Sequence, residues 1–259
     1  MAVTTSGKDK LTKHARIYCG GVDLSGDWKT IGTIRNGYEV ADMLGVSEDC
    51  HHFAPSSGID TGIDGFQSLM SDTAVTGAHT VLNSAPNTTQ TSIVFGGGGD
   101  PASGDPAYHL PSLQLSDSNS LSGGSPILST NFVYDKAQYT DNYLGGFGVC
   151  LRGPVSIAAN VDGATGNSFD MGAASAATAT WSAVIQVLAT ASGNYAFTLE
   201  DSSDGDSYSG ITGGAFTTTG AAIGSELLSA TGAVKQYVAF NAVKTAGTVT
   251  VVVTFVRST

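Results

Sequence analysis

The C-terminal segment from Val234 to Arg257 constrains the fold of this chain more than any other stretch. In its second half, Val249, Val251, Val253 and Phe255 alternate with threonine and valine residues. This period of two gives a β-strand one wholly apolar face, and such a strand must pack against a second layer. Lys244-Thr245-Ala246-Gly247 separates it from an upstream strand and predicts a short hairpin turn there.

The same pattern continues upstream of this pair. Residues 181–190 and 195–200 read as two further strands, each bounded by glycine, serine or asparagine. Four short strands with turns at this spacing predict an antiparallel β-sandwich. We therefore expect residues 153–259 to form an Ig-like or jelly-roll-like β-sandwich that begins at Gly153-Pro154.

The N-terminal half is also expected to be mainly β-structure. Residues 1–13 are polar and basic and predict an extended arm, and a Gly20-Gly21 turn predicts a hairpin within 16–25. Further strands are expected at 28–34, 88–95, 127–134 and 143–151, where the glycines of the last indicate a bulge or a close backbone approach. Residues 37–64 predict a long loop and 100–125 a surface excursion, because both are rich in turn-forming residues.

One short helix is expected in this domain, which spans 14–152. Apolar residues recur at three- and four-residue spacing from Ala74 to Ala85, Asp72 or Thr73 can cap the N-terminus, and Pro86 prevents continuation.

Charge is scarce and unevenly distributed. Only 13% of the residues are charged, against about a quarter in average soluble domains, so part of the surface is expected to lie against other protein. Six of the eleven basic residues fall within the first 35 positions, whereas 36–135 has eleven acidic residues and no basic one. The net charge of −11 argues against a phosphate-binding surface, and the segregation predicts contact between an acidic segment and a basic arm.

The cysteine count and the hydropathy pattern limit the setting. Three cysteines cannot all pair within one chain, and free buried thiols in a protein assembled in the cytoplasm are the simplest account. No apolar run approaches the roughly 20 residues that span a bilayer, and the first residues have no secretory apolar region, so no membrane association is expected.

No residue pattern predicts catalysis, a cofactor or a metal. The Gly-Ile-Asp repeat within 58–65 lacks the residue arrangement of a calcium loop. Cys50-His51-His52 has the side chains of a zinc site, but adjacent residues in an extended chain point to opposite faces and rarely bind one ion together. The Asp201–Asp206 run is either a calcium site or, as we favour, a hairpin turn built on Asp-Gly. None of the five histidines lies in a hydrolase motif, and the Gly96–Gly99 run lacks the lysine of a phosphate loop.

Two groups of segments resemble a known family. Arg16–Gly26 (RIYCGGVDLSG) followed by Gly65-Phe66 and the helix resembles the opening of tail tube (major tail) proteins of long-tailed bacteriophages. The second group is similar to the closing half of such phage structural proteins: Asp204–Tyr208, Gly213–Phe216, Ala230–Tyr237 and Thr248–Arg257.

This resemblance implies an all-β tail-tube-type sandwich or barrel, followed by the second sandwich, in a structural protein of the virion without catalysis or cofactor. Such subunits form hexameric rings that stack into a tube, contact other virion proteins, are assembled in the host cytoplasm, and let DNA pass without specific binding. An acidic lumen would repel phosphate. The candidate inter-subunit contacts are Lys8, Lys10, Lys13, Arg16, Glu48, Asp49, His51, His52 and Phe53, and the candidate lumen or acidic-face residues are Asp60 and Asp64.

Other functions remain open at this level. A capsid decoration or cement protein would use the same β-sandwiches on an icosahedral lattice. A carbohydrate-binding or adhesin module would be favoured if Trp181, Tyr195 and Tyr208 lined one exposed face. A histidine-dependent enzyme is a third class.

Overall fold

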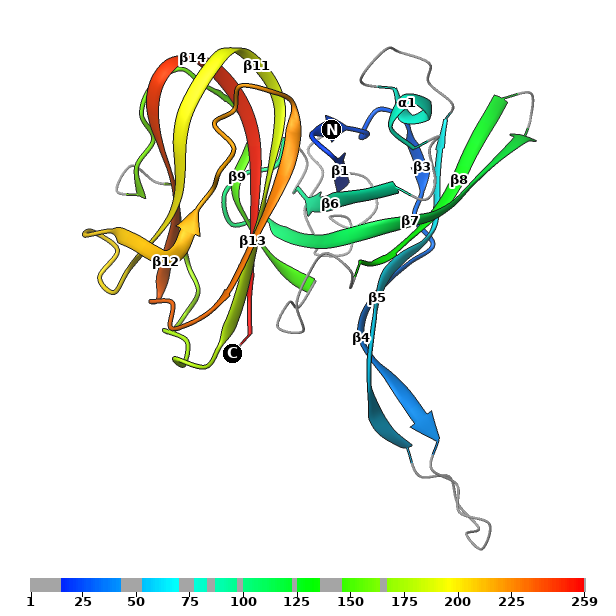
Figure 1. The fold of residues 1–259 in the computed structure, drawn as a ribbon, viewed down its shortest axis with the longest axis horizontal. Coiled ribbons are helices and arrows are strands. Elements are labelled where there is room, and N and C mark those ends of the chain that lie inside the picture. Colours follow the sequence, from blue (N-terminus) through cyan, green and yellow to red (C-terminus); the bar gives the residue numbers. More distant parts are fainter. Residues whose placement is uncertain are drawn as a thin grey trace, which may run out of the picture.

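The computed structural model describes residues 15–42, 53–69, 77–82, 87–96, 100–122, 125–135, 146–163 and 167–258. Within these residues every element but one is a β-strand, which confirms the all-β prediction (Figure 1). The strands are β1 Ala15–Cys19, β2 Val22–Asp23, β3 Trp28–Thr30, β4 Thr33–Asp42, β5 Phe53–Leu69, β6 Asn87–Phe95, β7 Pro106–Ser122, β8 Ser125–Tyr134, β9 Gly146–Ile157, β10 Ser168–Asp170, β11 Thr180–Ser202, β12 Ser209–Ala215, β13 Gly224–Thr231 and β14 Tyr237–Arg257.

All strand pairs are antiparallel, and one path of hydrogen-bonded neighbours runs β12-β11-β14-β9-β7-β6-β1-β2. The strands β8, β5, β4 and β3 branch from this path through β7. The path therefore joins an N-terminal half (described residues 15–135) to a C-terminal half (146–258) through backbone pairing.

In the C-terminal half, two long bent strands, β11 and β14, take the place of the four short strands that were predicted. The strand β14 pairs with β11 from Trp181↔Arg257 to Ser202↔Tyr237, and residues 244–247 lie inside β14, so the predicted hairpin turn there is wrong. The ladder bends at this point: Ser192 has φ 54 and Gly247 has φ 65, and the register shifts between Ala191 and Tyr195. A Cβ on Gly247 would lie 2.2 Å from the Ser192 carbonyl oxygen. Glycine thus allows a corner in a continuous strand rather than a chain reversal.

The period-two pattern at the C-terminus is confirmed by burial. Val249, Val251, Val253 and Phe255 are all at most 1% exposed and share one core with residues of β9 and β11. The rings of Trp181 and Phe255 stack with centroids 6.0 Å apart in this core. Each large apolar side chain buried here contributes about 1.5–3 kcal/mol to folding.

The N-terminal half has its own core. It includes Ile17, Phe66, Ile93, Leu110 and Phe132, from five different strands, and the helix packs on it through Ala78 and Leu82. The hairpin predicted around Gly20-Gly21 is confirmed: both glycines have positive φ, 60° and 85°, between β1 and β2.

The predicted helix is present as α1, Ala78–Leu82. The backbone amide of Ala78 donates to the Asp27 carboxylate at 3.1 Å, so a residue far away in sequence satisfies one of the free amides of the first turn. The candidate caps Asp72 and Thr73 lie outside the described residues, as do Ala74, Val75 and Ala85.

The strand β7 occupies most of the segment 100–125, so the surface excursion predicted there is wrong. Pairing of β7 with β9 stops at His109, and pairing with β8 on the same side starts at Ser112. Pro111 lies in the gap between these two pairings, so neither β9 nor β8 requires the backbone amide that proline lacks. A proline-containing central strand is thus accommodated by a change of partner.

The strand β9 runs through the boundary expected at Gly153-Pro154. It pairs with β7 through Gly146–Val149 and with β14 through Val149–Ile157, so it belongs to both halves. The close backbone approach predicted for the glycines of 143–151 is confirmed at Gly148, where a Cβ would lie 2.0 Å from a backbone oxygen. Gly153, just beyond that range, has the same role: a Cβ there would lie 1.7 Å from a backbone oxygen, and the β9–β14 register shifts nearby. Cys19 and Cys150 are free and buried, as expected, whereas Cys50 lies outside the described residues. None of the described helices has the length and apolar character needed to cross a bilayer.

Candidate assembly interface

A two-stranded ribbon formed by β4 and β5 projects from the body of the molecule (Figure 1). The strand β5 pairs with β8 only from Gly62 onward, so the part made of 36–42 and 53–61 is a hairpin in which each strand has one partner among the described residues. Seven residues of β4 extend over roughly 24 Å at about 3.4 Å per residue. The long loop expected over 37–64 is therefore largely β-structure.

The ribbon is anchored at its foot by charge. The Arg35 guanidinium forms an ion pair with Asp60, and it donates to both oxygens of Asp64, at 2.6 Å and 3.3 Å. Asp60 and Asp64 lie on the same side of β5 because they are separated by an even number of residues. A Cβ on Gly62, between them, would lie 3.0 Å from Arg35 Nη2, so glycine makes room for the guanidinium. These side chains are each 33–40% exposed, which limits the stabilisation to about 1 kcal/mol or less per pair.

Three of the predicted site residues can be placed with their side chains. Asp60 and Asp64, the predicted acidic-face residues, both pair with Arg35, whose single positive charge offsets one of their two negative charges. Arg16, a predicted inter-subunit contact, forms an ion pair with Asp100 at 3.0 Å on the surface. The two cations that pair with the acidic segment 36–135 here, Arg16 and Arg35, both belong to the first 35 residues.

The remaining predicted contacts cannot be placed. Phe53 begins β5, but the placement of its side chain is not described. Seven others lie outside the described residues: Lys8, Lys10, Lys13, Glu48, Asp49, His51 and His52.

An apolar groove of about 450 Å³ lies beside the foot of the ribbon. It is lined by Ala15, Trp28, Lys29, Thr30, Ile31, Gly32, Ile34, Phe95 and Phe147. The Phe147 ring is 53% exposed and contacts Phe95 and Tyr108, with ring centroids 6.5 Å and 5.1 Å apart. A half-exposed aromatic ring at a groove is typical of a surface that binds protein.

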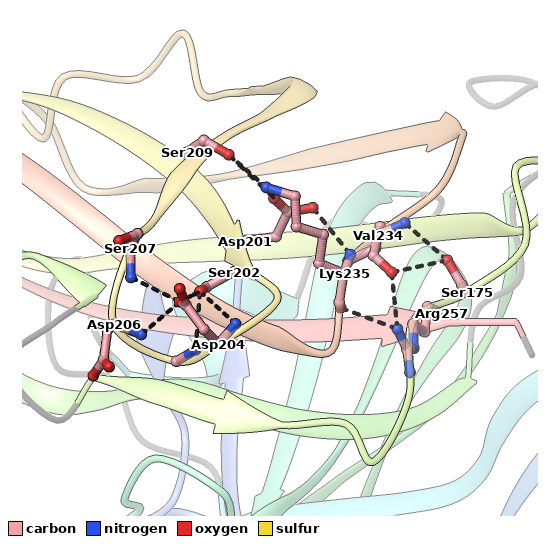
Figure 2. Close-up of polar contacts among 11 residues, drawn as sticks. Ser175, Asp201, Ser202, Asp204, Asp206, Ser207, Ser209, Val234, Lys235 and Arg257 are labelled. Carbon is pink, nitrogen blue, oxygen red and sulfur yellow. Dashed lines mark hydrogen bonds and ion pairs between the residues drawn. The ribbon is translucent and has the colours of Figure 1, made fainter.

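The Asp201–Asp206 run is a hairpin turn, as favoured over a calcium site (Figure 2). The Asp204 carboxylate accepts from Ser202 Oγ at 2.7 Å and from the amides of Asp206 and Ser207 at 3.0 Å, and Gly205 has φ 80°. These hydrogen bonds lower the pKa of Asp204 to about 2. Its Oδ1 atom is thus used by the turn, and the described residues contain no group of three metal-binding side chains.

The carboxylate of Asp201, at the end of β11, makes contacts with a different segment (Figure 2). It accepts from the backbone amide of Lys235 at 3.0 Å and forms an ion pair with the Lys235 ammonium at 3.1 Å. It thereby ties the end of β11 to the segment that leads into β14.

The aromatic platform of a carbohydrate-binding module is not formed. Trp181 and Tyr195 are 3% and 1% exposed and lie in the C-terminal core, where the Tyr195 hydroxyl donates to the carbonyls of Ile157 and Gly247. The condition on which the carbohydrate-binding interpretation depended is therefore not met.

His109 is the buried histidine of the described residues, and it joins the two halves. Its Nδ1 lies 2.8 Å from Thr254 Oγ1 and its Nε2 lies 2.9 Å from Ser182 Oγ. Burial lowers the pKa of His109 to about 3, so the ring is neutral at pH 7. Because its partners are Ser182 on β11 and Thr254 on β14, we interpret His109 as a structural residue that links β7 to these two strands.

The sequence contained an unused signal for the ribbon. Ile34, Tyr38 and Val40 alternate with Arg35, Glu39 and Ala41, which is the period of a strand. The glycines and the proline of the segment favoured a loop instead, although proline is tolerated in an edge strand. The pairing of Arg35 with two aspartates from the other strand depends on the register and was not predicted.

Comparisons with known proteins give little further information. No family model matches this chain, and no curated protein matches it. Among solved structures, the chain is similar to the crystal structure of SPP1 Dit (gp 19.1), described as a paradigm of hub adsorption apparatus in Gram-positive infecting phages. The two are 12% identical, the match covers 95% of this chain and 100% of that chain, and the TM-score is 0.34. A TM-score of this size does not establish a common fold.

Proposed function

We propose that this protein is a non-catalytic structural subunit of a long-tailed bacteriophage virion, and that copies of it assemble through the β4–β5 ribbon into stacked hexameric rings that form the tail tube. The resemblance of Arg16–Gly26 and of the C-terminal segments to tail tube proteins motivates the choice of particle. The site itself supports association rather than catalysis, because its distinguishing features are backbone edges and an apolar groove.

The projecting ribbon is the observation that carries the proposal. An isolated two-stranded hairpin is marginally stable in water, and it presents unpaired amides and carbonyls along both edges. Residues 36–42 of β4 and 53–61 of β5 have only each other as strand partners among the described residues. A second copy of the chain that contacts this ribbon would supply hydrogen-bond partners for the backbone groups at its edges.

Charge and composition support the same partner. Arg35 offsets only one of the two negative charges of Asp60 and Asp64, and residues 36–61 also carry Glu39, Asp42, Glu48 and Asp49 and no basic residue. The first thirteen residues carry three lysines against one aspartate. Contact between the basic arm of one copy and the acidic ribbon of the next would lower the net charge of the contact, and the acidic excess elsewhere would keep DNA from adhering to the tube.

The test is the assembly state of the full chain and of a variant with a shortened ribbon. Because Gly37 pairs with Asp60, residues 38–59 can be replaced by Asn-Gly, which closes the hairpin as a two-residue turn and keeps Arg35, Asp60 and Asp64. Sedimentation velocity and negative-stain microscopy should show rings or tubes for the full chain and monomers for the variant. The variant should keep the thermal midpoint of the body.

Each outcome has a definite meaning. A full chain that stays monomeric at high concentration, with and without salt, would overturn the proposal. Particles with icosahedral positions would indicate a capsid decoration protein instead. Tubes formed equally by the shortened variant would show that the ribbon is not the contact.

A further inference from the structure

The two halves meet across a buried junction rather than a flexible connection. Tyr18, Val94 and Ala107 of the N-terminal half form an apolar cluster with Cys150 of β9 and Val252 of β14, and all five are at most 1% exposed. The strand β9 is hydrogen-bonded to β7 on one side and to β14 on the other. Apolar packing and a continuous ladder therefore both cross from one half to the other.

A buried glutamine adds polar contacts to this junction. Gln186 of β11 is fully buried, and its Oε1 accepts from the backbone amide of Gly21 at 2.7 Å. Its Nε2 donates to the carbonyl of Gln90 at 3.0 Å and lies 3.3 Å from Ser92 Oγ. One side chain of the C-terminal half thus satisfies groups from β6 and from the turn between β1 and β2, and breaking these bonds would leave buried polar groups unpaired.

The Gly20-Gly21 turn is shaped to fit this contact. A Cβ on Gly21 would lie 2.4 Å from the backbone nitrogen of Gly224 and 2.6 Å from its carbonyl oxygen. Gly21 also has φ 85°, which other residues rarely adopt. The turn therefore approaches the start of β13 backbone to backbone, and glycine is required both for the turn and for the approach.

His109, near the start of β7, completes the junction. Its ring reaches Ser182 on β11 and Thr254 on β14, at 2.9 Å and 2.8 Å. We call Gly21, Gln90, His109, Ser182, Gln186 and Thr254 the inter-half seam. The strand β7 that carries His109 also pairs with β8, which in turn pairs with the foot of the ribbon on β5.

We infer that the C-terminal sandwich is a brace and not an independently displayed module: the inter-half seam makes the two halves one cooperative unit and holds the ribbon in one direction relative to the sandwich. The mechanical path runs from β5 through β8 and β7 to β11 and β14. Water can reach the buried polar groups of the inter-half seam only if the two cores separate. Partial separation would leave these groups without hydrogen-bond partners and is therefore costly. This inference does not depend on the identity of the assembled particle.

The chain provides its own probes, because one of its two tryptophans lies in each half. Trp28 packs on the N-terminal core and Trp181 lies in the C-terminal core. In Trp28→Phe, fluorescence reports the C-terminal half, and in Trp181→Phe it reports the N-terminal half. Urea denaturation of each variant is followed by fluorescence and by circular dichroism, which reports the whole chain.

The expected result is that the two signals coincide within each variant. Because each comparison is made within one molecule, a stability change caused by the tryptophan substitution does not affect it. A fluorescence transition that is complete before the circular dichroism transition begins, in either variant, would overturn the inference.

A second pair of variants tests the seam itself. Gly21→Ala adds a methyl group against Gly224, and the matched Gly26→Ala adds one where no heavy atom lies within 4 Å. In each tryptophan background, Gly21→Ala should separate the two transitions, and Gly26→Ala should leave them coincident. Gln186→Leu serves if Gly21→Ala does not fold. Transitions that remain coincident and unshifted in both seam variants would show that the seam does not couple the halves.

Discussion

The stability of this protein should fall steeply below pH 6.5 because of His109. Burial lowers the pKa of this imidazole from 6.5 to about 3 in the folded chain. The unfolded chain therefore binds a proton between these two pKa values and the folded chain does not. The part of the free energy of unfolding that depends on a neutral His109 is fully present above pH 6.5 and is lost as the pH falls towards 3.

The magnitude follows from the shift. A difference of about 3.5 pKa units corresponds to about 5 kcal/mol over the whole range, at about 1.36 kcal/mol per unit. At pH 5.0 the unfolded imidazole is almost fully protonated, and the loss is about 2 kcal/mol. Such a loss is a large fraction of the 5–15 kcal/mol that typically stabilises a domain.

The assay compares the full chain with His109→Gln by urea denaturation at pH 7.5 and pH 5.0. Glutamine keeps a polar group between Ser182 and Thr254 but does not titrate. The other four histidines are common to both proteins, so their effects cancel in the comparison. The full chain should lose about 2 kcal/mol more than the variant between the two pH values. Equal losses would refute the assignment of a neutral buried imidazole at this position.

Three further predictions concern other parts of the molecule. Gly148→Ala should reduce the free energy of unfolding by about 2 kcal/mol or more, because its Cβ would lie 2.0 Å from a backbone oxygen, whereas Gly210→Ala, with no heavy atom within 4 Å, should leave it within about 0.5 kcal/mol. Arg35→Gln should speed amide hydrogen exchange in β4 and β5 but not in β14, because two carboxylates would then face each other without a cation. The pKa of Asp204, measured by NMR titration, should be about 2 and should rise in Ser202→Ala, which removes one donor to the carboxylate.

The fold class could be predicted from local patterns because burial imposes them on the sequence. The alternation from Val249 to Phe255, the glycine pair at 20–21 and the apolar spacing around Ala78 each identified an element that the structure contains. Turn chemistry was a less reliable guide, because the same residues serve two purposes. Gly247 and Pro111 lie inside strands, one at a bend and the other between two partners.

The candidate site was predicted only in part, for a related reason. The acidic segment 37–64 is punctuated by Pro55, Gly58 and Gly62 and has no sustained apolar period, so it resembled a loop. The charge of Asp60 and Asp64 was evident from the sequence, whereas their pairing with Arg35 depends on how β4 and β5 align.

The sequence by itself determined an all-β chain with a deficit of charge, an acidic middle and a buried C-terminal strand, since these properties depend on composition and on a spacing of two residues. Tertiary structure alone decided that β11 and β14 each run through a corner, that β9 belongs to both halves, and that Gly21 meets Gly224. Those features arise from contacts between residues far apart in the chain, where the register of one strand against another decides which groups meet.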